Sequence, residues 1–424
     1  MSVLLGALLL LLALLGVPLF AVIAAGALAG FARQGVDGAV LGIELMRLAD
    51  MPVLTAIPLF TFAGYLLGES GAPRRLVDLC QALFGWLPGG FVLVALAASA
   101  LFTAFTGASG VTIVALGALL LPALERLGYP RRFALGLVTT SGSLGLLFAP
   151  AVPLILYAVI AQQLDLGLSL RIEDMFLAGL LPGLSMILVL WAWCVRPGAH
   201  HRPEPGPRPP LAAALRGAAW ELPLPLLVLG GIYGGYIAVS EAAALTAAYV
   251  LLITVLVRRE VSWRRLPGLA RESMTMVGAI LLVLGVSLAS TNYVIDAGLP
   301  MRLFAWIRTH VDGALSFLIL LNLFLLALGM LLDIFSALVL MVPLILPVAL
   351  AYGVDPLHLG VIMLANLQLG YLTPPVGLNL FIAAHRFQAD LWTVYRSTLP
   401  FFLVLLAVVL LVTYWPALSL AWVG

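Results

Sequence analysis

The stretch "LQLGYLTPPVGLNLFIAA", Leu367–Ala384, lies within a longer uncharged run, Leu359–Ala384. The length and composition of this run predict a membrane-spanning helix. Its middle, however, holds Pro374, Pro375 and Gly377. Proline removes a backbone donor and clashes with the preceding turn, and lipid offers no partner for the backbone groups that are freed. The sequence therefore predicts a helix that breaks here, inside the protein or against a water-filled cavity.

The composition of the whole chain indicates that lipid is its main solvent. Of its 424 residues, 63% are hydrophobic and only 9% are charged, whereas a soluble domain has about 25% charged residues. The pattern lacks the short alternating segments of a membrane barrel. The formal net charge of +2 gives no reason to expect nucleic-acid binding. We therefore expect an all-α polytopic membrane protein. Uncharged runs near the ~20 residues of a spanning helix include Met175–Val195, Leu222–Ser240, Ser273–Ile295 and Ser397–Gly424.

Arginine placement predicts how the chain is oriented, because short cytoplasmic loops are enriched in basic residues. Four regions qualify: Arg74–Arg75, Arg126 to Arg132, Arg196–Arg216 and Arg258 to Arg271. The third is also Pro-rich and is typical of a linker between two halves. We expect scaffold helices in 1–75 and 221–295, a cytoplasmic linker in 196–220, and two related halves in 76–195 and 296–424.

The two related halves emerge when the chain is compared with itself at an offset of 225 residues. Glycines and prolines then coincide without a gap: Pro122 with Pro347, Gly128 with Gly353, Gly145 with Gly370, and Pro150 with Pro375. Each half holds a candidate hairpin followed by a helix that is broken in the middle. Counting the crossings between them gives opposite orientations, which is an inverted repeat. Paired Gly/Pro-interrupted segments in two inverted halves point to the binding site of a transporter.

The candidate hairpins are Gln81–Leu124, with its tip at Thr106–Gly110, and Leu315–Leu350, with its tip near Asp333–Ser336. The arms of the first, Phe91–Phe105 and Val111–Leu124, would be ~21–23 Å long at 1.5 Å per residue. That is less than the ~30 Å hydrocarbon core, which favours a re-entrant hairpin. Two complete crossings joined by a glycine-rich turn are the alternative.

Backbone groups that a break leaves free are suited to binding ions. Carbonyls with nearby hydroxyls can coordinate Na⁺, and N–H groups at helix starts attract anions. A single hydroxyl in a membrane helix commonly bonds its own i−4 carbonyl instead. Asp333 is the one acidic residue between Asp312 and Asp355; a charge within a membrane segment is a functional candidate, although Asp333 would also serve as a helix cap.

We expect substrate contacts from Ser109, Thr112, Ser141, Asp333, Ser336 and Asn366. Na⁺ ligands are expected among Thr106, Ser109, Gly110, Gly142, Gly145, Gly329, Gly370 and Thr373. The helix breaks are expected at Pro150, Pro374, Pro375 and Gly377.

Catalysis is the alternative to transport. "GASG", Gly107–Gly110, matches the G-x-S-G pattern of an intramembrane serine hydrolase, which needs a base beside the serine. All histidines fall in predicted loops or at helix ends, and the chain has no lysine for an ATP-binding loop. These features favour an ion-coupled transporter over an enzyme.

Several stretches resemble one known family. They include "GGFVLVALAASALFTAFTGASG", Gly89–Gly110; "MLLDIFSALVLMVPLILPVALAYGVDPLHLGVIM", Met330–Met363; and "NLQLGYLTPPVGLNLF", Asn366–Phe381. The chain resembles, over nearly its whole length, the large membrane subunit (DctM type) of tripartite ATP-independent periplasmic (TRAP) transporters in the ion-transporter superfamily.

The resemblance implies Na⁺-coupled import of an organic acid across the bacterial inner membrane, with both hairpins in a domain that moves like an elevator. It also implies two protein partners, a periplasmic substrate-binding protein and a small membrane subunit. The substrate would be a dicarboxylate, a sialic acid, a keto acid or a sugar acid. A stand-alone anion carrier of the same superfamily is the closest alternative.

Overall fold

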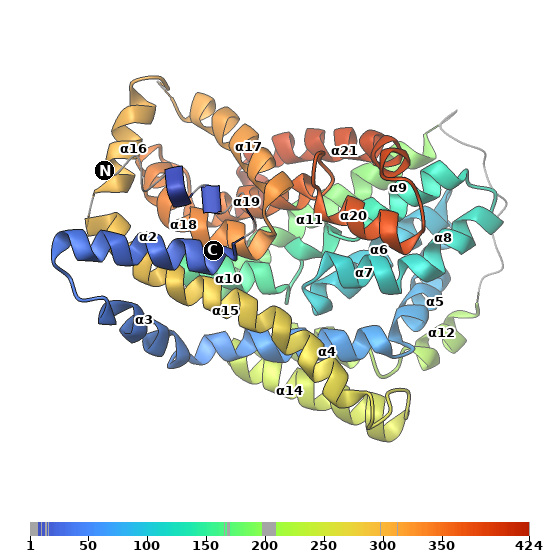
Figure 1. Ribbon diagram of the computed structural model, residues 1–424. Coiled ribbons are helices and arrows are strands. Elements are labelled where there is room, and N and C mark those ends of the chain that lie inside the picture. Colours follow the sequence, from blue (N-terminus) through green and yellow to red (C-terminus); the bar gives the residue numbers. More distant parts are fainter. Residues whose placement is uncertain are drawn as a thin grey trace.

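All regular structure in the described part of the chain is helical (Figure 1). The computed structural model describes residues 17–164, 166–167, 170–196, 209–296, 298–311 and 313–423, with 7–9, 11–12 and 15 near the N-terminus. Of the expected linker, 196–220, the stretch 197–208 lies outside these residues. Seven described helices are long and apolar enough to cross a membrane, or up to nine if each of two bent pairs is one span. This agrees with the polytopic helical protein expected from composition.

The first group of helices comes from both expected scaffold segments. The long helix α15 crosses α2, α3 and α4, and α14 packs along α4 (Figure 1). This group holds α2 (Leu19–Gln34), α3 (Ala39–Ala49), α4 (Ala56–Glu69), α13 (Pro223–Tyr233), α14 (Val239–Leu251) and α15 (Leu266–Asp296). Short elements adjoin it: η1 (Pro52–Thr55), the π-helix η3 (Leu252–Val257) and α16 (Leu299–Arg308).

The second group holds the two hairpins and the two broken helices. Its first half comprises α6 (Gly90–Thr106), α7 (Ser109–Ala115), α8 (Gly117–Arg126), α9 (Arg131–Ser141), η2 (Leu144–Leu147), α10 (Val152–Gln162) and α11 (Ile172–Val195). Its second half comprises α17 (Ala314–Leu331), α18 (Ile334–Ala351), α19 (Pro356–Gly370), α20 (Leu378–Arg386), α21 (Leu391–Tyr414) and α22 (Ala417–Leu420). Two short helices, α5 (Ala72–Phe84) and α12 (Leu211–Gly217), pack together at its edge.

Both helix breaks occur where the sequence predicts them. The helix α9 ends at Ser141 and α10 begins at Val152, while α19 ends at Gly370 and α20 begins at Leu378. The bonds Ala149–Pro150 and Pro374–Pro375 are cis, at positions that coincide under the 225-residue offset. The irregular stretches therefore contain Pro150, Pro374, Pro375 and Gly377, as expected.

The hairpin tips also lie where expected. Gly107, with a left-handed φ of +65°, ends α6 before α7 begins, which only glycine does at little cost. Leu332 and Asp333 alone separate α17 from α18. The membrane depth of the two tips stays a prediction.

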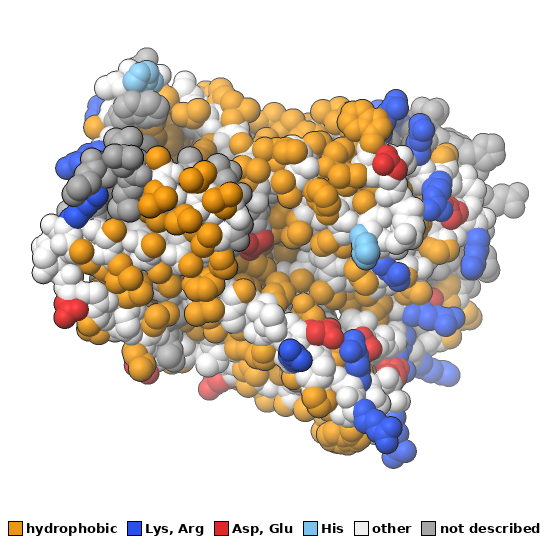
Figure 2. Space-filling model, viewed as in Figure 1, with side chains coloured by type: hydrophobic (Ala, Val, Ile, Leu, Met, Phe, Trp, Pro, Cys, Tyr) orange, Lys and Arg blue, Asp and Glu red, His pale blue; other side chains and the backbone are white. Residues whose placement is uncertain are grey.

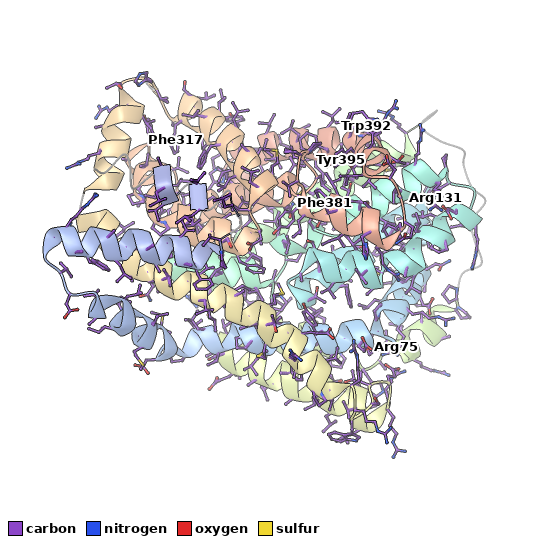
Figure 3. The ribbon with its side chains drawn as sticks, viewed as in Figure 1. Arg75, Arg131, Phe317, Phe381, Trp392 and Tyr395 are labelled. Atoms are coloured by element: carbon purple, nitrogen blue, oxygen red, sulfur yellow. The ribbon has the colours of Figure 1, made fainter. Side chains whose placement is uncertain are left out.

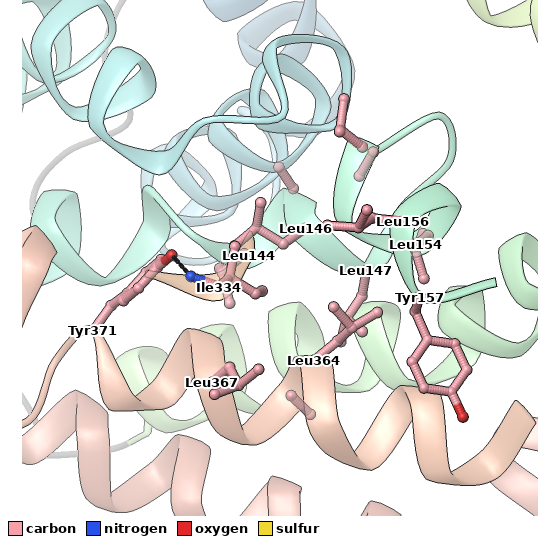
Figure 4. Packing of buried hydrophobic residues seen from close by; sticks show 14 of the residues in the cluster. Leu144, Leu146, Leu147, Leu154, Leu156, Tyr157, Ile334, Leu364, Leu367 and Tyr371 are labelled. Atoms are coloured by element: carbon pink, nitrogen blue, oxygen red, sulfur yellow. Dashed lines mark hydrogen bonds between the residues drawn. The ribbon is translucent and has the colours of Figure 1, made fainter. Parts of the chain in front are cut away.

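The two halves of the second group are packed across each other. The hairpin helix α7 lies on α20, and the hairpin helix α18 lies on α10. Leu144 to Leu156 from the first break meet Ile334, Leu364 and Tyr371 from the other half in one buried core (Figure 4). Each hairpin therefore stabilises the broken helix of the opposite half.

One expected span is wrong in its length. The run Leu222–Ser240 contains a helix only over Pro223–Tyr233, about 16 Å long. Gly234 and Gly235 end it, and Gly235 has a φ of +69°. Glycine favours such turns over the continuation of a helix, so an uncharged run overestimates the helix here.

Two of the predicted cytoplasmic regions meet at one end of the molecule. Arg75, labelled in Figure 3, donates from Nε to the Glu221 carboxylate at 2.9 Å and also pairs with Glu260. Burial alone would raise the pKa of Glu260, but hydrogen bonds from Arg75 and from the Gly71 N–H lower it. Charged side chains gather at this end of the surface (Figure 2). The two regions therefore lie on the same side, as the arginine pattern requires.

One close helix crossing in the second group depends on two glycines. A Cβ on Gly370 would lie 2.6 Å from the backbone of Gly329. We expect Gly370→Ala to lower the free energy of unfolding by about 1–3 kcal/mol, because α17 and α19 would have to separate. Thermal unfolding in detergent measures this change.

Gly278→Ala is the matched control, since a Cβ there meets nothing within 4 Å and alanine favours a helix. A Gly370→Ala protein as stable as the Gly278→Ala protein would contradict the close crossing.

Candidate functional site

A cavity of about 710 Å³ separates the two groups of helices. The tips of both hairpins line one wall, Gly107 to Val111 from the first and Asp333 to Ser336 from the second. The scaffold helices α4 and α15 line the other wall, with Tyr65, Glu69, Arg265 and Glu272 among their residues. Figure 2 shows the surface hollowed between the two groups. Segments more than 200 residues apart in sequence thus converge on one space.

At the first tip, Ser109 is held by the opposite half of the chain. Its hydroxyl donates to Oδ1 of Asn379, at the start of α20, over 2.7 Å. Both residues are buried, and Nδ2 of Asn379 has no hydrogen-bond partner in the described structure. An amide oxygen is no general base, and no described histidine lines the cavity. The described structure therefore pairs Ser109 with an amide and not with a base.

At the second tip, Asp333 caps the helix α18. Its Oδ1 accepts from the N–H groups of Phe335 and Ser336 at 3.0 Å, and its Oδ2 accepts from the Ser336 hydroxyl at 2.6 Å. The N–H of Ile334 donates to the Tyr371 hydroxyl at 2.6 Å (Figure 4). The Asp333 carboxylate therefore both caps α18 and lines the cavity.

The scaffold wall carries the charge that an anion would meet. Arg265 is the only basic residue among the described residues that line the cavity. It pairs with Glu69 at 3.1 Å and with Glu272 at 3.3 Å, and its side chain remains 45% exposed. Two carboxylates thus share one guanidinium, which leaves N–H donors available to a third anion.

The first helix break gathers oxygen atoms in a buried position. Oγ1 of Thr103 lies 2.7 Å from Oγ1 of Thr112, 2.9 Å from the carbonyl of Gly142 and 2.8 Å from that of Ser99. A hydroxyl has one hydrogen to donate, so it cannot bond all of these oxygens at once. Hard cations prefer such oxygen-only surroundings.

The second break is poorer in free oxygens. The hydroxyl of Thr373 donates to the Leu369 carbonyl at 3.3 Å, and the N–H of Gly377 donates to the Met330 carbonyl at 3.2 Å. Gly329 and Gly370 touch through their backbones. In this arrangement these glycines allow close packing, and Gly377, with a φ of +55°, allows the turn into α20.

The cavity collects some of the predicted residues and leaves others elsewhere. Ser109, Gly110, Asp333 and Ser336 line it. The Ser141 hydroxyl instead lies 3.1 Å from both the Ser99 hydroxyl and the Val138 carbonyl, and Asn366 donates to Asn322 and Ile362. The remaining predicted ligands also lie outside its lining, and their roles stay predictions: Thr106, Thr112, Gly142, Gly145, Gly329, Gly370 and Thr373.

The comparisons with known proteins agree with this arrangement. The family model "Tripartite ATP-independent periplasmic transporter, DctM component" matches residues 5–418. The chain belongs to the DctM family. It is 34% identical over 381 residues to the C4-dicarboxylate TRAP transporter large permease protein DctM of Rhodobacter capsulatus, covering 87% of this chain and 86% of that protein.

Other DctM relatives carry different substrate names. The chain is 31% identical to the sialic acid TRAP transporter large permease protein SiaM of Vibrio cholerae, covering 88% of this chain and 86% of that one. Among solved structures, the YdaH transporter of Alcanivorax borkumensis shares the fold with a TM-score of 0.63 at 15% identity, covering 91% of this chain and 88% of that one. These proteins are transporters, which agrees with the expectation that this DctM protein is not an enzyme.

Sequence reasoning missed several residues of the site. Thr103 lies one turn before the first predicted hairpin tip and Asn379 lies just after the second predicted break, so a search for polar residues near these positions would have found them. No local sequence pattern marks Glu69, Arg265 and Glu272 as site residues. They reach the hairpin tips of this DctM protein only because the fold brings α4 and α15 there.

The bond between Ser109 and Asn379 can be tested by a double-mutant cycle. Ser109→Ala leaves both polar ends of the buried Asn379 amide unpaired, so we expect it to destabilise the protein by about 1–3 kcal/mol. Asn379→Ala removes the same bond from the other side. The destabilisation of the double variant should be smaller than the sum of the two single effects by about 1 kcal/mol, as measured by thermal unfolding.

Ser185→Ala is the control, because Ser185 bonds only the Pro182 carbonyl of its own helix. Strictly additive effects of Ser109→Ala and Asn379→Ala would argue against the bond.

Proposed function

We propose that this DctM protein is the large permease subunit of a Na⁺-coupled, binding-protein-dependent importer of an organic acid across the bacterial inner membrane. The observation that carries the proposal is the cavity in which both hairpin tips face a scaffold wall. In this proposal the substrate occupies that cavity. Asp333, Ser336 and Ser109 contact it from the hairpins, and Arg265 contacts it from the scaffold.

The charges around the cavity support coupling to a cation. The described lining residues include three acidic side chains, Glu69, Glu272 and Asp333, and one basic side chain, Arg265. An organic anion in this cavity would be repelled by the carboxylates, which outnumber the one guanidinium. A bound Na⁺ would offset that repulsion. The oxygens around Thr103 and Gly142 fit one Na⁺. We place a second near Asp333 and the Thr373 break, which requires the local backbone to open.

The packing of the two groups supports alternating access by an elevator motion. Each hairpin is fixed to the broken helix of the other half, so both halves would move as one body. The cavity lies between this body and α4 with α15, where a sliding surface is required. The equivalent breaks 225 residues apart support an inverted repeat.

The names of the relatives support the proposed partners and limit the substrate. One relative, the isethionate TRAP transporter permease protein DctMQ of Oleidesulfovibrio alaskensis, extends well beyond the matched region, which covers 60% of it. We propose that a small membrane subunit and a periplasmic substrate-binding protein complete the present transporter. The named substrates of the relatives above include a dicarboxylate and a sialic acid. Isethionate is a sulfonate, so the shared feature is an organic anion, and we propose an organic-acid substrate.

Uptake into proteoliposomes tests the function. The complete assembly should accumulate a radiolabelled organic acid from a panel of succinate, sialic acid and keto acids when Na⁺ is outside. Accumulation should vanish when K⁺ replaces Na⁺ or when the binding protein is omitted. Undiminished uptake without Na⁺ would refute coupling, and uptake without the binding protein would favour a stand-alone carrier.

The substitution Asp333→Asn separates the charge of Asp333 from its capping role. Asparagine caps helices about as well as aspartate, so the melting temperature should stay within a few degrees. Transport should fall by about tenfold or more, because one cation-binding charge is lost. Normal uptake by Asp333→Asn would reduce Asp333 to a structural cap.

The scaffold contact is tested by Arg265→Gln. We expect uptake of the organic acid to fall by about tenfold, the effect of ~1.4 kcal/mol, because an anion loses its only described cation in the cavity. Arg264→Gln is the matched control, since Arg264 is adjacent and exposed but does not line the cavity. Equal uptake by the two variants would remove Arg265 from the transport path.

A further inference from the structure

The two helix breaks differ in how they are covered. In the first break Gly142 to Leu147 and Pro150 are buried. In the second break Pro374 and Pro375 are exposed, and Val376 is 41% exposed. Irregular backbone is tolerated at membrane depth only where protein or water covers it, not where it faces free lipid. The second break is therefore open on a side where the described chain buries the first.

A groove of about 190 Å³ runs beside the exposed break. Leu372, Thr373 and Pro374 form one side. Residues of the first three turns of α21 form the other side, and the walls are almost wholly apolar: Trp392, Tyr395, Arg396, Leu399 and Phe402. A helix with its side chains is about 10–12 Å across, so the groove suits a single hydrocarbon chain better than a helix.

The entrance of the groove has the chemistry of a lipid headgroup site. Arg396 is exposed and forms no ion pair with any described residue. Trp392 is 65% exposed, and the Tyr395 hydroxyl donates to the Pro375 carbonyl at 2.7 Å (Figure 3). These residues begin the candidate span Leu391–Tyr414. Tryptophan and tyrosine concentrate at the level of the headgroups, where arginine meets anionic phosphates.

We propose that one anionic phospholipid binds in this groove. Its phosphate pairs with Arg396 beside Trp392, and one acyl chain lies along Leu399 and Phe402 against Pro374. The lipid covers the exposed residues Pro374 and Pro375 of the second break, between α19 and α20. This site goes beyond the proposed transport function and does not depend on which substrate is carried.

Native mass spectrometry of the purified, delipidated protein tests the site with dioleoylphosphatidylglycerol and dioleoylphosphatidylcholine as probes. The native chain should bind the first, anionic lipid more tightly than the zwitterionic one. Arg396→Gln should weaken binding of the anionic lipid about fivefold, the effect of one basic residue at a membrane surface. Arg396→Lys should retain most of the binding.

Arg126→Gln is the matched control, because Arg126 is exposed at the end of α8 and does not line the groove. It should bind phosphatidylglycerol as the native chain does. Equal binding of the two lipids by the native chain would overturn the proposal, as would equal loss in the Arg396→Gln and Arg126→Gln proteins.

A second variant tests the acyl part of the site. Leu399→Trp places a larger side chain in the groove and should reduce retention of both lipids while leaving Arg396 in place.

The small membrane subunit is the other occupant to consider. If Arg396→Gln and Leu399→Trp weaken capture of that subunit but leave lipid binding unchanged, a protein covers the break and the lipid proposal is wrong.

Discussion

The constraint on which this structure depends is that lipid cannot hydrogen-bond a protein backbone. Two helices of this chain nevertheless break within long apolar stretches. The fold meets the constraint by cross-packing. The helix after each break packs against a hairpin from the other half of the chain: α20 contacts α7, and α10 contacts α18. The N–H of Gly377 and the carbonyl of Met330 then satisfy each other. Contacts within each half complete the cover, since Oγ1 of Thr103 lies 2.9 Å from the Gly142 carbonyl and Gly377 bonds Met330.

The same cross-packing creates the site. Because the hairpin tips are fixed to the opposite broken helices, Ser109 and Asp333 reach one cavity although they are distant in sequence. The tips present helix starts, short polar side chains and the carboxylate of Asp333, and the scaffold presents Glu69, Arg265 and Glu272. Substrate held between the two groups would therefore meet one carboxylate on the hairpin wall and three ionisable side chains on the scaffold wall.

The buried polar residues show how one chemistry serves two roles. Thr103 contacts the first break, while Ser141 and Asn366 bond within or between helices and do not line the cavity. In a low-dielectric interior every such group must find a partner, so a buried hydroxyl or amide near a break is as well explained by packing as by ligand binding. Family membership indicates that the protein takes part in transport. It does not say which of these residues bind ligands and which only pack.

The polytopic helical character, the family and the glycines and prolines that interrupt the apolar runs can be read from the sequence. Proline and glycine act locally on the backbone, and their positions in apolar runs are visible without knowing the fold. Three further features come from the tertiary structure: Gly370 is needed for contact with Gly329, Asn379 holds Ser109, and α13 stops at Tyr233. The tertiary structure also decided that Arg265 faces the hairpin tips and that the second break is uncovered. Those features depend on which surfaces meet in space, and residues far apart in the chain leave no local pattern of their meeting.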